Sequence, residues 1–295
     1  SIASSAGAFA ALRADGSVVT WGNSNFGADS SEVANQLDGL IDVISIKSNN
    51  SSFGAAFAAL RVDGSVVTWG NLSFGADSSD VSDQLDGATG VVSLHSSERA
   101  FAALRFDGSV VTWGSSSFGA DSSDVADQLD GTVNVVSIQS TSRAFAALRS
   151  DGSVVTWGSS PHGGNSSSVA SEIGGSIDVI SIRSSTYAFA ALRSNGSVVT
   201  WGGAFYGGDS SDVAVQLDGT TPVVSIQTTS QAFAALRLDG SIVTWGNALY
   251  GGNSSAVSYK LKGNITIGDN LDTDTDGASN TSEWNSCITP YVLNA

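Results

Sequence analysis

The chain repeats one pattern of apolar and polar positions, first complete at residues 8–22 as AFAALRADGSVVTWG. Two apolar runs flank an Asp-Gly pair, which tolerates the positive φ angles of a tight two-residue turn, so each copy predicts a β-hairpin. The fifth copy has Asn195-Gly196 at this turn, and Asn also tolerates positive φ. The later copies begin at Ala56, Ala100, Ala144, Ala188 and Ala232.

The Trp-Gly pair that ends each copy sets the period of the repeat. From Trp21 onward these pairs follow at intervals of 48, 44, 44, 44 and 44 residues, the longer interval reflecting extra residues within 49–55. A further apolar run, such as Val-Val-Ser-Ile at 135–138, precedes each hairpin. Each unit is therefore predicted to hold three strands. The second and third are apolar on both faces, which predicts that other layers cover them on both sides.

A polar segment with a few apolar positions follows each Trp-Gly pair, as at 121–131. Its serines can cap a short helix, Val125 and Leu129 lie four residues apart on one helical face, and Gly131 suits a C-terminal stop. We expect one or two helical turns here. A fourth, outer strand is the alternative.

A small sheet repeated with a period of about 44 residues matches a β-propeller, in which sheets surround an axis; a linear solenoid is the alternative. We assign residues 1–267 to an all-β propeller and 268–295 to a tail. The chain lacks methionine and begins inside a first strand, so we expect a processed product or a fragment. We expect a closed ring of six or seven blades, with residues 264–267 pairing beside the first blade to remove an open sheet edge.

The repeated core Leu-x-x-Asp-Gly-x-Val-x-x-Trp-Gly, preceded by Val-Val-Ser-Ile, resembles the repeat of the regulator of chromosome condensation family over roughly residues 1–262. That resemblance implies a propeller, which has seven blades in the family, whereas six copies are visible here. The short period and small loops resemble the secreted or surface microbial branch, which includes a propeller-type inhibitor protein of β-lactamase.

The chain is strongly acidic, which bears on the ligands it can bind. The net charge of −16 repels phosphate backbones, which argues against nucleic acid and anionic membrane surfaces as ligands. The sequence has no apolar run near the ~18 residues that a membrane span needs. The single cysteine, Cys287, cannot form an internal disulfide, so it does not indicate a redox compartment.

The tail carries the clearest candidate for a metal site. Residues 272–283 fit the twelve-position EF-hand calcium loop, with carboxylates at positions 1, 3 and 5, Gly277 at 6 and a glutamate at 12. The flanks do not suit a paired helix–loop–helix, so the loop resembles the isolated calcium loops of dockerins and thrombospondin type 3 repeats. We expect structural calcium; a disordered acidic linker is the alternative. The expected ligands are Asp272, Asp274, Asp276, the carbonyl of Ala278, Asn280 and Glu283.

An arginine follows the second strand in every copy. A ring of six could bind an anion, but identical placement favours ion pairs within or between blades, for example with the hairpin aspartates. These residues are Arg13, Arg61, Arg105, Arg149, Arg193 and Arg237.

Positions that differ between copies are better candidates for partner binding. One set ends the first strand and would surround the mouth of a channel: Lys47, His95, Gln139, Arg183 and Gln227. A second lies in the following loop: Arg99, Arg143 and Tyr187. A third consists of rings after Trp-Gly, which either bind a partner or pack beneath their own loops. These are Phe26, Phe74, Phe118, His162, Tyr206 and Tyr250.

Signatures of catalysis are absent from the sequence. His95 and His162 occupy non-equivalent repeat positions, and no nucleophile elbow, zinc-binding His pair or phosphate loop is present. We therefore predict a non-catalytic extracellular or cell-surface module that binds protein or glycan or self-assembles. A secreted enzyme inhibitor and an enzyme with a site in the channel are the alternatives.

Overall fold

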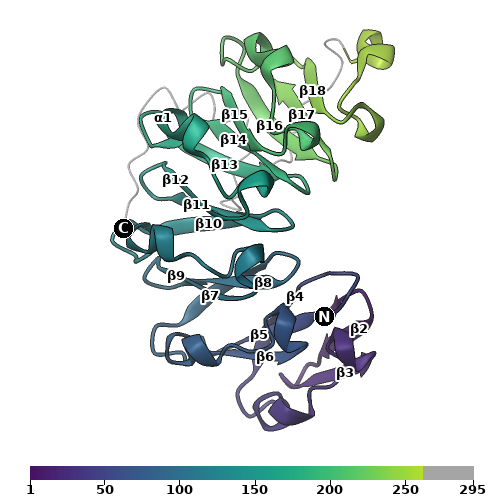
Figure 1. Ribbon diagram of the computed structural model, residues 1–295, viewed down its shortest axis with the longest axis vertical. Helices are drawn as coiled ribbons and strands as arrows, with labels where there is room; N and C mark the ends of the chain where they lie inside the picture. The colour runs from purple at the N-terminus through teal and green to yellow at the C-terminus, as the bar shows by residue number, and fades with distance from the viewer. Residues whose placement is uncertain (262–295) are drawn as a thin grey trace.

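The computed structural model describes residues 1–261 and contains six three-stranded antiparallel sheets, one for each repeat. The three strands of each sheet are neighbours in the order in which they occur in the chain (Figure 1). We call each sheet with the turns that follow it a blade, numbered 1 to 6 along the chain. The six-bladed, all-β propeller architecture predicted from the repeats is confirmed.

The first strands are β1 (Ile2–Ser4), β4 (Val43–Ser48), β7 (Val91–Ser96), β10 (Val135–Ser140), β13 (Val179–Ser184) and β16 (Val223–Thr228). The second strands are β2 (Ala8–Leu12), β5 (Ala56–Arg61), β8 (Ala100–Arg105), β11 (Ala144–Arg149), β14 (Ala188–Arg193) and β17 (Ala232–Arg237). The third strands are β3 (Val18–Gly22), β6 (Val66–Gly70), β9 (Val110–Gly114), β12 (Val154–Gly158), β15 (Val198–Gly202) and β18 (Ile242–Gly246).

The predicted hairpins are present, but their turns are longer than the two residues expected. In blade 3 the Arg105 N–H donates to the Ser109 carbonyl at 2.9 Å and the Gly108 N–H donates to the Arg105 carbonyl at 3.0 Å, so the loop holds three residues, 106–108. Leu104 pairs with Val110 across it, and Gly108 has a φ of 77°. Asp107 accepts hydrogen bonds from the backbone N–H and the hydroxyl of Ser109. The Gly108 carbonyl accepts a 2.9 Å hydrogen bond from the N–H of Val135, the first residue of the next blade's first strand. The turn thus closes one blade and positions the next.

Two short 3₁₀ helices follow each third strand, and one α-turn, α1 (Ala170–Ile173), extends the second of them in blade 4. The predicted helical turns are therefore correct, and no named fourth strand occurs within residues 1–261. The first helices are η1 (Ser24–Phe26), η3 (Leu72–Phe74), η5 (Ser116–Phe118), η7 (Ser160–His162), η9 (Ala204–Tyr206) and η11 (Ala248–Tyr250). The second are η2 (Ser31–Gln36), η4 (Ser79–Gln84), η6 (Ser123–Gln128), η8 (Ser167–Val169), η10 (Ser211–Gln216) and η12 (Ser255–Lys260).

The hydrophobic core consists of five clusters, each shared by two consecutive blades. Between blades 3 and 4, Ala102 and Leu104 of β8 face Phe145 and Ala147 of β11. Trp157 also lies in this cluster, and its Nε1–H donates a 3.0 Å hydrogen bond to the Gly119 carbonyl of blade 3. Alanines on one face let a phenylalanine from the next blade approach closely, as the sequence predicts.

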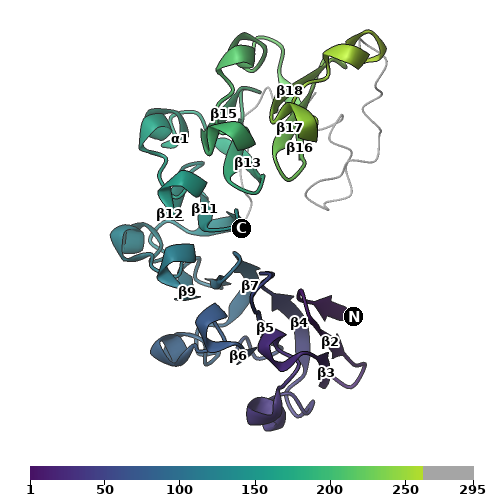
Figure 2. The same ribbon diagram turned by 45° about the vertical axis from the view of Figure 1, so that its right-hand side comes forward.

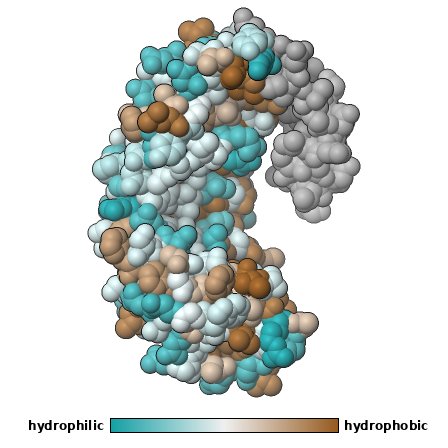
Figure 3. All heavy atoms as spheres, turned by 90° about the vertical axis from the view of Figure 1, so that its right-hand side faces the viewer, coloured by the Kyte–Doolittle hydropathy of each residue, from teal (hydrophilic) through white to brown (hydrophobic). Residues whose placement is uncertain are grey.

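The blades form an open crescent with blade 1 at one tip and blade 6 at the other (Figures 2 and 3). First strands of consecutive blades contact one another on the concave side. The expectation of a closed ring is wrong for residues 1–261. The face of blade 1 that would pack on the last blade of a ring is exposed: Trp21 is 45% accessible, whereas its counterpart Trp69 in blade 2 is 4% accessible. Residues 264–267, expected to close the ring, lie outside the described residues.

Candidate functional site

Each blade presents loops at two opposite edges. The chain passes up the first strand, down the second and up the third, so the loops after the first and third strands emerge at one edge. We call this edge the upper rim. The Asp-Gly hairpins emerge at the opposite edge, which we call the lower rim.

The lower rim contains the repeated arginines, and most of them pair with the aspartate of their own hairpin. The closest approaches of nitrogen to oxygen are 3.3 to 3.9 Å, in the pairs Arg13–Asp15, Arg61–Asp63, Arg105–Asp107, Arg149–Asp151 and Arg237–Asp239. In blade 5, Asn195 replaces the aspartate, and Arg193 instead donates from Nε to the Ser197 hydroxyl at 2.8 Å. The interpretation of these arginines as internal ion pairs agrees with this geometry.

The upper rim carries two stacks of cationic and aromatic side chains, each formed by side chains from different blades. The guanidinium carbon of Arg99, in blade 3, lies 4.7 Å from the ring centre of Phe74 in blade 2 and 4.6 Å from that of Phe118 in its own blade. The same Phe118 ring also contacts an arginine of the next blade: the guanidinium carbon of Arg143, in blade 4, lies 4.5 Å from its centre. Arg99 thus inserts between a ring of the preceding blade and a ring of its own blade, and Arg143 packs on the ring of the preceding blade.

The second stack is aromatic and joins blades 4 and 5. The Tyr187 ring lies 4.2 Å from the rings of both His162 and Tyr206, measured between centroids. We call the series Phe74, Arg99, Phe118, Arg143, His162, Tyr187 and Tyr206 the rim ladder. The rim ladder brings together the second set of candidate residues and four members of the third. The contacts that define the ladder do not include the other two, Phe26 and Tyr250.

The backbone holds these loops in register. The Glu98 N–H donates to the Ser142 carbonyl at 3.0 Å, and the Ser142 N–H donates to the Thr186 carbonyl at 2.9 Å. The Thr186 N–H donates to Ser230 in turn, at 2.9 Å. Four successive blades are therefore linked along the upper rim by backbone hydrogen bonds, which fixes the spacing of the side chains that the loops carry.

Arg99 and Arg143 differ electrostatically from the lower-rim arginines. Neither forms an ion pair with a carboxylate among residues 1–261, and the Nε of each is buried there without a hydrogen-bond partner. Burial and then the positive charge of Arg143 lower the pKa of His162, so this ring is neutral at pH 7. The rim ladder thus presents two uncompensated cations on a chain whose net charge is −16.

The first set of candidate residues forms a separate row along the concave side. Lys47, His95, Gln139, Arg183 and Gln227 each pair with an alanine of the second strand. Burial, followed by the charge of Lys47 in the preceding blade, lowers the pKa of His95 to about 4. The ring Nε2 of His95 lies 3.0 Å from the Ser93 hydroxyl. These side chains line the inner surface of an open crescent instead of the mouth of a closed channel.

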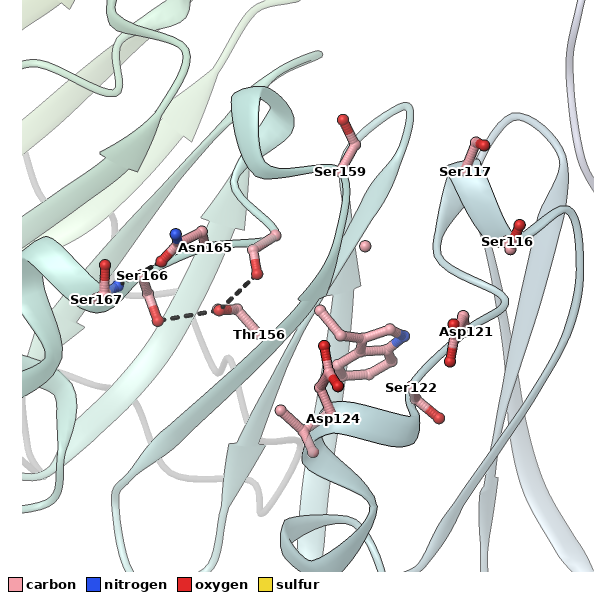
Figure 4. Close-up of a pocket in the computed structure, with 14 residues that line it drawn as sticks. Ser116, Ser117, Asp121, Ser122, Asp124, Thr156, Ser159, Asn165, Ser166 and Ser167 are labelled. Atoms are coloured by element: carbon pink, nitrogen blue, oxygen red, sulfur yellow. Dashed lines mark hydrogen bonds between the residues drawn. The ribbon is translucent and has the colours of Figure 1, made fainter.

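A groove of about 730 Å³ separates the outer loops of blades 3 and 4 (Figure 4). Its lining includes Asp121 and Asp124 on one side and Asn165 and Ser167 on the other. Trp157 also lines the groove. The Thr156 hydroxyl in this groove lies 2.9 Å from the Ser166 hydroxyl. Every other blade has the equivalent Thr–Ser contact. This polar lining therefore belongs to the repeat and does not distinguish one blade from another.

Sequence reasoning found the members of the rim ladder but missed their association. It treated the loop residues and the rings after Trp-Gly as separate sets, because they lie about 20 residues apart within one repeat. The available signal was their common edge, since both loops follow strands that run in the same direction. The insertion at 49–55 also contributes a ring, because Phe53 lies 5.8 Å from the Arg99 guanidinium.

Within residues 1–261 no group of three or more His, Cys, Asp or Glu side chains is placed to hold a metal ion. The calcium-loop residues, Asp272 to Glu283, lie outside the described part, so their predicted role stays a prediction. Among the helices of the described part, none has the length and apolar character that crossing a bilayer requires.

No protein-family model and no curated protein matches the sequence. Solved structures match its fold. Yeast RCC1 (Prp20), in a complex with Kap60, is 18% identical with a TM-score of 0.50, over 83% of this chain and 69% of that one. Human WBSCR16 is 17% identical with a TM-score of 0.49, over 86% and 79%.

The ectodomain of the receptor kinase CR4 from Physcomitrella patens is 19% identical with a TM-score of 0.49, and the match covers 83% of this chain. This chain spans 62% of the length of that ectodomain. At these identities, the likeness to the yeast protein supports an RCC1-like propeller fold and nothing finer.

Proposed function

We propose that this chain is a non-catalytic binding module whose upper rim recognises a protein segment that presents carboxylate groups. One observation carries the proposal: Arg99 and Arg143 are stacked against Phe118 with buried Nε atoms that have no partner within residues 1–261. A buried, unpaired donor destabilises a fold unless something satisfies it. The Nε atoms are shielded from solvent, but both side chains are only partly buried and their terminal nitrogens form no hydrogen bond with residues 1–261, so a ligand carboxylate would accept charge-assisted hydrogen bonds from those nitrogens.

The surroundings of these cations favour recognition. Rigid aromatic side chains and arginines are the residues that contribute most to protein interfaces, because they bury large areas at little entropic cost. Stacking on Phe118 fixes both guanidinium groups before any ligand arrives, which reduces the entropy lost on binding. The yeast RCC1 (Prp20) structure, which is similar in fold, is a complex with a protein partner, Kap60, and this supports a protein ligand.

A binding role fits the two histidines better than catalysis does. The His95 ring contacts Ser93 and the His162 Nδ1 lies 2.8 Å from the Ser159 hydroxyl, but the hydrogen bonds of residues 1–261 link neither ring to a carboxylate that would orient it. A serine nucleophile normally needs such an oriented base. An inhibitor of a secreted enzyme would be one form of the proposed module, since inhibition also needs only a protein-binding rim.

We also propose an extracellular or cell-surface location, with calcium bound in the tail. The support is the acidic composition and the loop pattern at 272–283. Extracellular modules bind calcium with dissociation constants of about 10⁻⁴–10⁻³ M. Terbium luminescence sensitised by Trp284, beside the loop, tests the site directly. Emission should rise in the wild-type chain and be lost in the Asp276→Ala variant; equal emission from both would exclude this loop.

Binding of a probe peptide of eight glutamates, measured by fluorescence anisotropy at about 0.15 M salt, tests the rim. The Arg99→Gln/Arg143→Gln variant should bind at least 10-fold more weakly than the wild type. The matched control is Arg105→Gln/Arg149→Gln, which removes the same charge from the lower rim of the same two blades and should bind as the wild type does.

Three outcomes would contradict the proposal. An octaglutamine probe that binds equally well would show that carboxylates are not recognised. Equal loss in both double variants would show that only the overall charge matters. A uronic-acid oligosaccharide that binds in place of the peptide would assign the rim to a glycan.

A further inference from the structure

The contact between consecutive blades is the same at all five junctions, and its two sides differ. The forward side, which receives the next blade, contributes alanines and a leucine from the second strand, as Ala188, Ala190 and Leu192 do in blade 5. The backward side, which packs on the preceding blade, contributes a stacked Phe–Trp pair, such as Phe233 and Trp245 with ring centres 5.3 Å apart. Every junction joins one forward face to one backward face.

Blade 1 presents a backward face that nothing in residues 1–261 covers. Phe9 is 45% accessible and Val19 is 48% accessible, whereas their counterparts in blade 2, Phe57 and Val67, are 0% and 3% accessible. Phe9 and Trp21 nevertheless keep the stacked arrangement, with ring centres 5.3 Å apart. The face is therefore already formed in the conformation that packs on a preceding blade elsewhere in the chain.

Blade 6 presents the complementary forward face. At each inner junction a glycine after the third strand touches the phenylalanine of the next blade so closely that an added Cβ would lie 2.5–2.9 Å from the ring. Within residues 1–261, no atom lies within 4 Å of the equivalent position at Gly251. Ala234 and Leu236 of β17 are also partly exposed, whereas Ala190 and Leu192 are 0% and 4% accessible.

We infer that a second copy of this chain docks head to tail, its blade 1 packing on blade 6 of the first. The five internal junctions specify this occupant, because they show the same two faces packed together. Trp21 Nε1–H would then donate to the Gly251 carbonyl, as the other five tryptophans donate to the equivalent glycines at 3.0 Å. Such an interface is heterologous, and it produces a closed ring or a filament according to the rotation between copies.

This inference does not depend on the proposed function, since the two open faces belong to blades 1 and 6 and the rim ladder spans blades 2 to 5. The high negative charge opposes self-association at low salt. The interface is mainly apolar, so added salt should strengthen it.

Two single variants on the open faces test the inference by analytical ultracentrifugation of residues 1–295 at several concentrations. Val19→Glu charges the backward face of blade 1, and Ala234→Glu charges the forward face of blade 6. The wild type should form larger species as concentration rises. Each variant alone should stay monomeric, because every copy has the same face blocked and no intact backward face can meet an intact forward face. In an equimolar mixture, the intact forward face of the Val19→Glu variant can bind the intact backward face of the Ala234→Glu variant, so a one-to-one dimer should form.

Val62→Glu serves as the control, because Val62 is 64% exposed in a hairpin away from both faces and this variant should associate as the wild type does. Retained circular dichroism of the variants excludes unfolding as the cause. A wild type that stays monomeric at all concentrations, as intramolecular closure of blade 1 onto blade 6 would give, overturns the inference. A mixture of the two variants that fails to dimerise overturns it as well.

Discussion

The two rims of the crescent are built from the same repeat, yet they differ in how well their charges are satisfied. On the lower rim, an arginine, an aspartate and a serine bond to one another in nearly every copy, as Arg105, Asp107 and Ser109 do. On the upper rim, the side chains change from blade to blade, and Arg99 and Arg143 lack a carboxylate partner within residues 1–261. Positions that every copy keeps therefore serve the fold, and positions that vary are available for recognition.

The largest expected effect comes from the lower rim. Gly108→Ala would force a residue with a Cβ into a φ of 77° and place that Cβ 2.6 Å from the Asn134 Cα. We expect the free energy of unfolding to fall by about 3 kcal/mol, from strain and overpacking together. Urea denaturation followed by tryptophan fluorescence measures this loss.

Gly203→Ser is the matched variant on the upper rim. Gly203 has a φ of −65°, and the equivalent position holds Ser115 in blade 3 and Ser159 in blade 4. The free energy of unfolding should change by no more than about 0.5 kcal/mol. A loss as large as that of Gly108→Ala would mean that both rims are equally constrained by folding.

The concave row between the rims should respond to acid. The pKa of His95 is about 4 in the folded state, below the ordinary value of 6.5 that applies to the unfolded chain. Above pH 6.5 His95 is neutral in both the folded and the unfolded state, so the protein keeps its full free energy of unfolding. The free energy of unfolding decreases as pH falls from 6.5 toward 4, because His95 binds a proton in the unfolded state and stays neutral in the folded state.

We expect this loss to be of order 2 kcal/mol. His95→Gln installs the residue that blades 4 and 6 carry at the same position, Gln139 and Gln227, and should flatten the pH profile between 6.5 and 4. Denaturation midpoints across that range measure the difference. Identical profiles for both proteins would show that His95 titrates normally.

The six blades could be predicted from the sequence because the same pattern of apolar runs and turn residues occurs six times. Asp-Gly, or Asn-Gly in blade 5, indicated each turn. The runs around Phe145 and Trp157 are apolar on both faces, so each required a neighbouring blade on both sides. Ring closure was not encoded in this way, because it depends on the small rotation between blades, to which many weak contacts contribute. The rim ladder was missed because several of its contacts join neighbouring repeats: Arg99 packs on Phe74 of blade 2, and Arg143 packs on Phe118 of blade 3. The sequence of one repeat does not indicate which side chains of the next repeat lie beside it.

Removing one cation from each rim should shift stability in opposite directions. Arg99→Met keeps a flexible apolar side chain over the Phe74 and Phe118 rings and removes the buried Nε that lacks a partner, so stability should rise by about 1 kcal/mol. Arg105→Met removes an ion pair and the 2.7 Å hydrogen bond to Ser109, so stability should fall by about 1 kcal/mol.

Thermal denaturation of the two variants, paired with binding of the glutamate peptide, distinguishes the rims. The Arg99 variant should be more stable and bind less, and the Arg105 variant should be less stable and bind normally. Stability changes of the same sign in both would remove the contrast on which the proposed function rests.

The smallest effect should come from repairing the exception on the lower rim. Asn195→Asp restores the carboxylate that the other hairpins carry, and its oxygen can keep the two hydrogen bonds from Ser197. Asn195 is exposed and Arg193 is partly buried, so the new ion pair would be open to solvent on the carboxylate side. We therefore expect a gain of only about 0.3–0.5 kcal/mol, which should be largely lost in 1 M salt. The equivalent Asp239 has a lowered pKa because of hydrogen bonds from the Ser241 hydroxyl and backbone and the charge of Arg237, so the gain should also disappear as pH falls below about 4. A gain that survives both salt and acid would mean that the hairpin aspartates stabilise the turn by geometry alone, and the lower rim would then owe its uniformity to backbone shape and not to charge pairing.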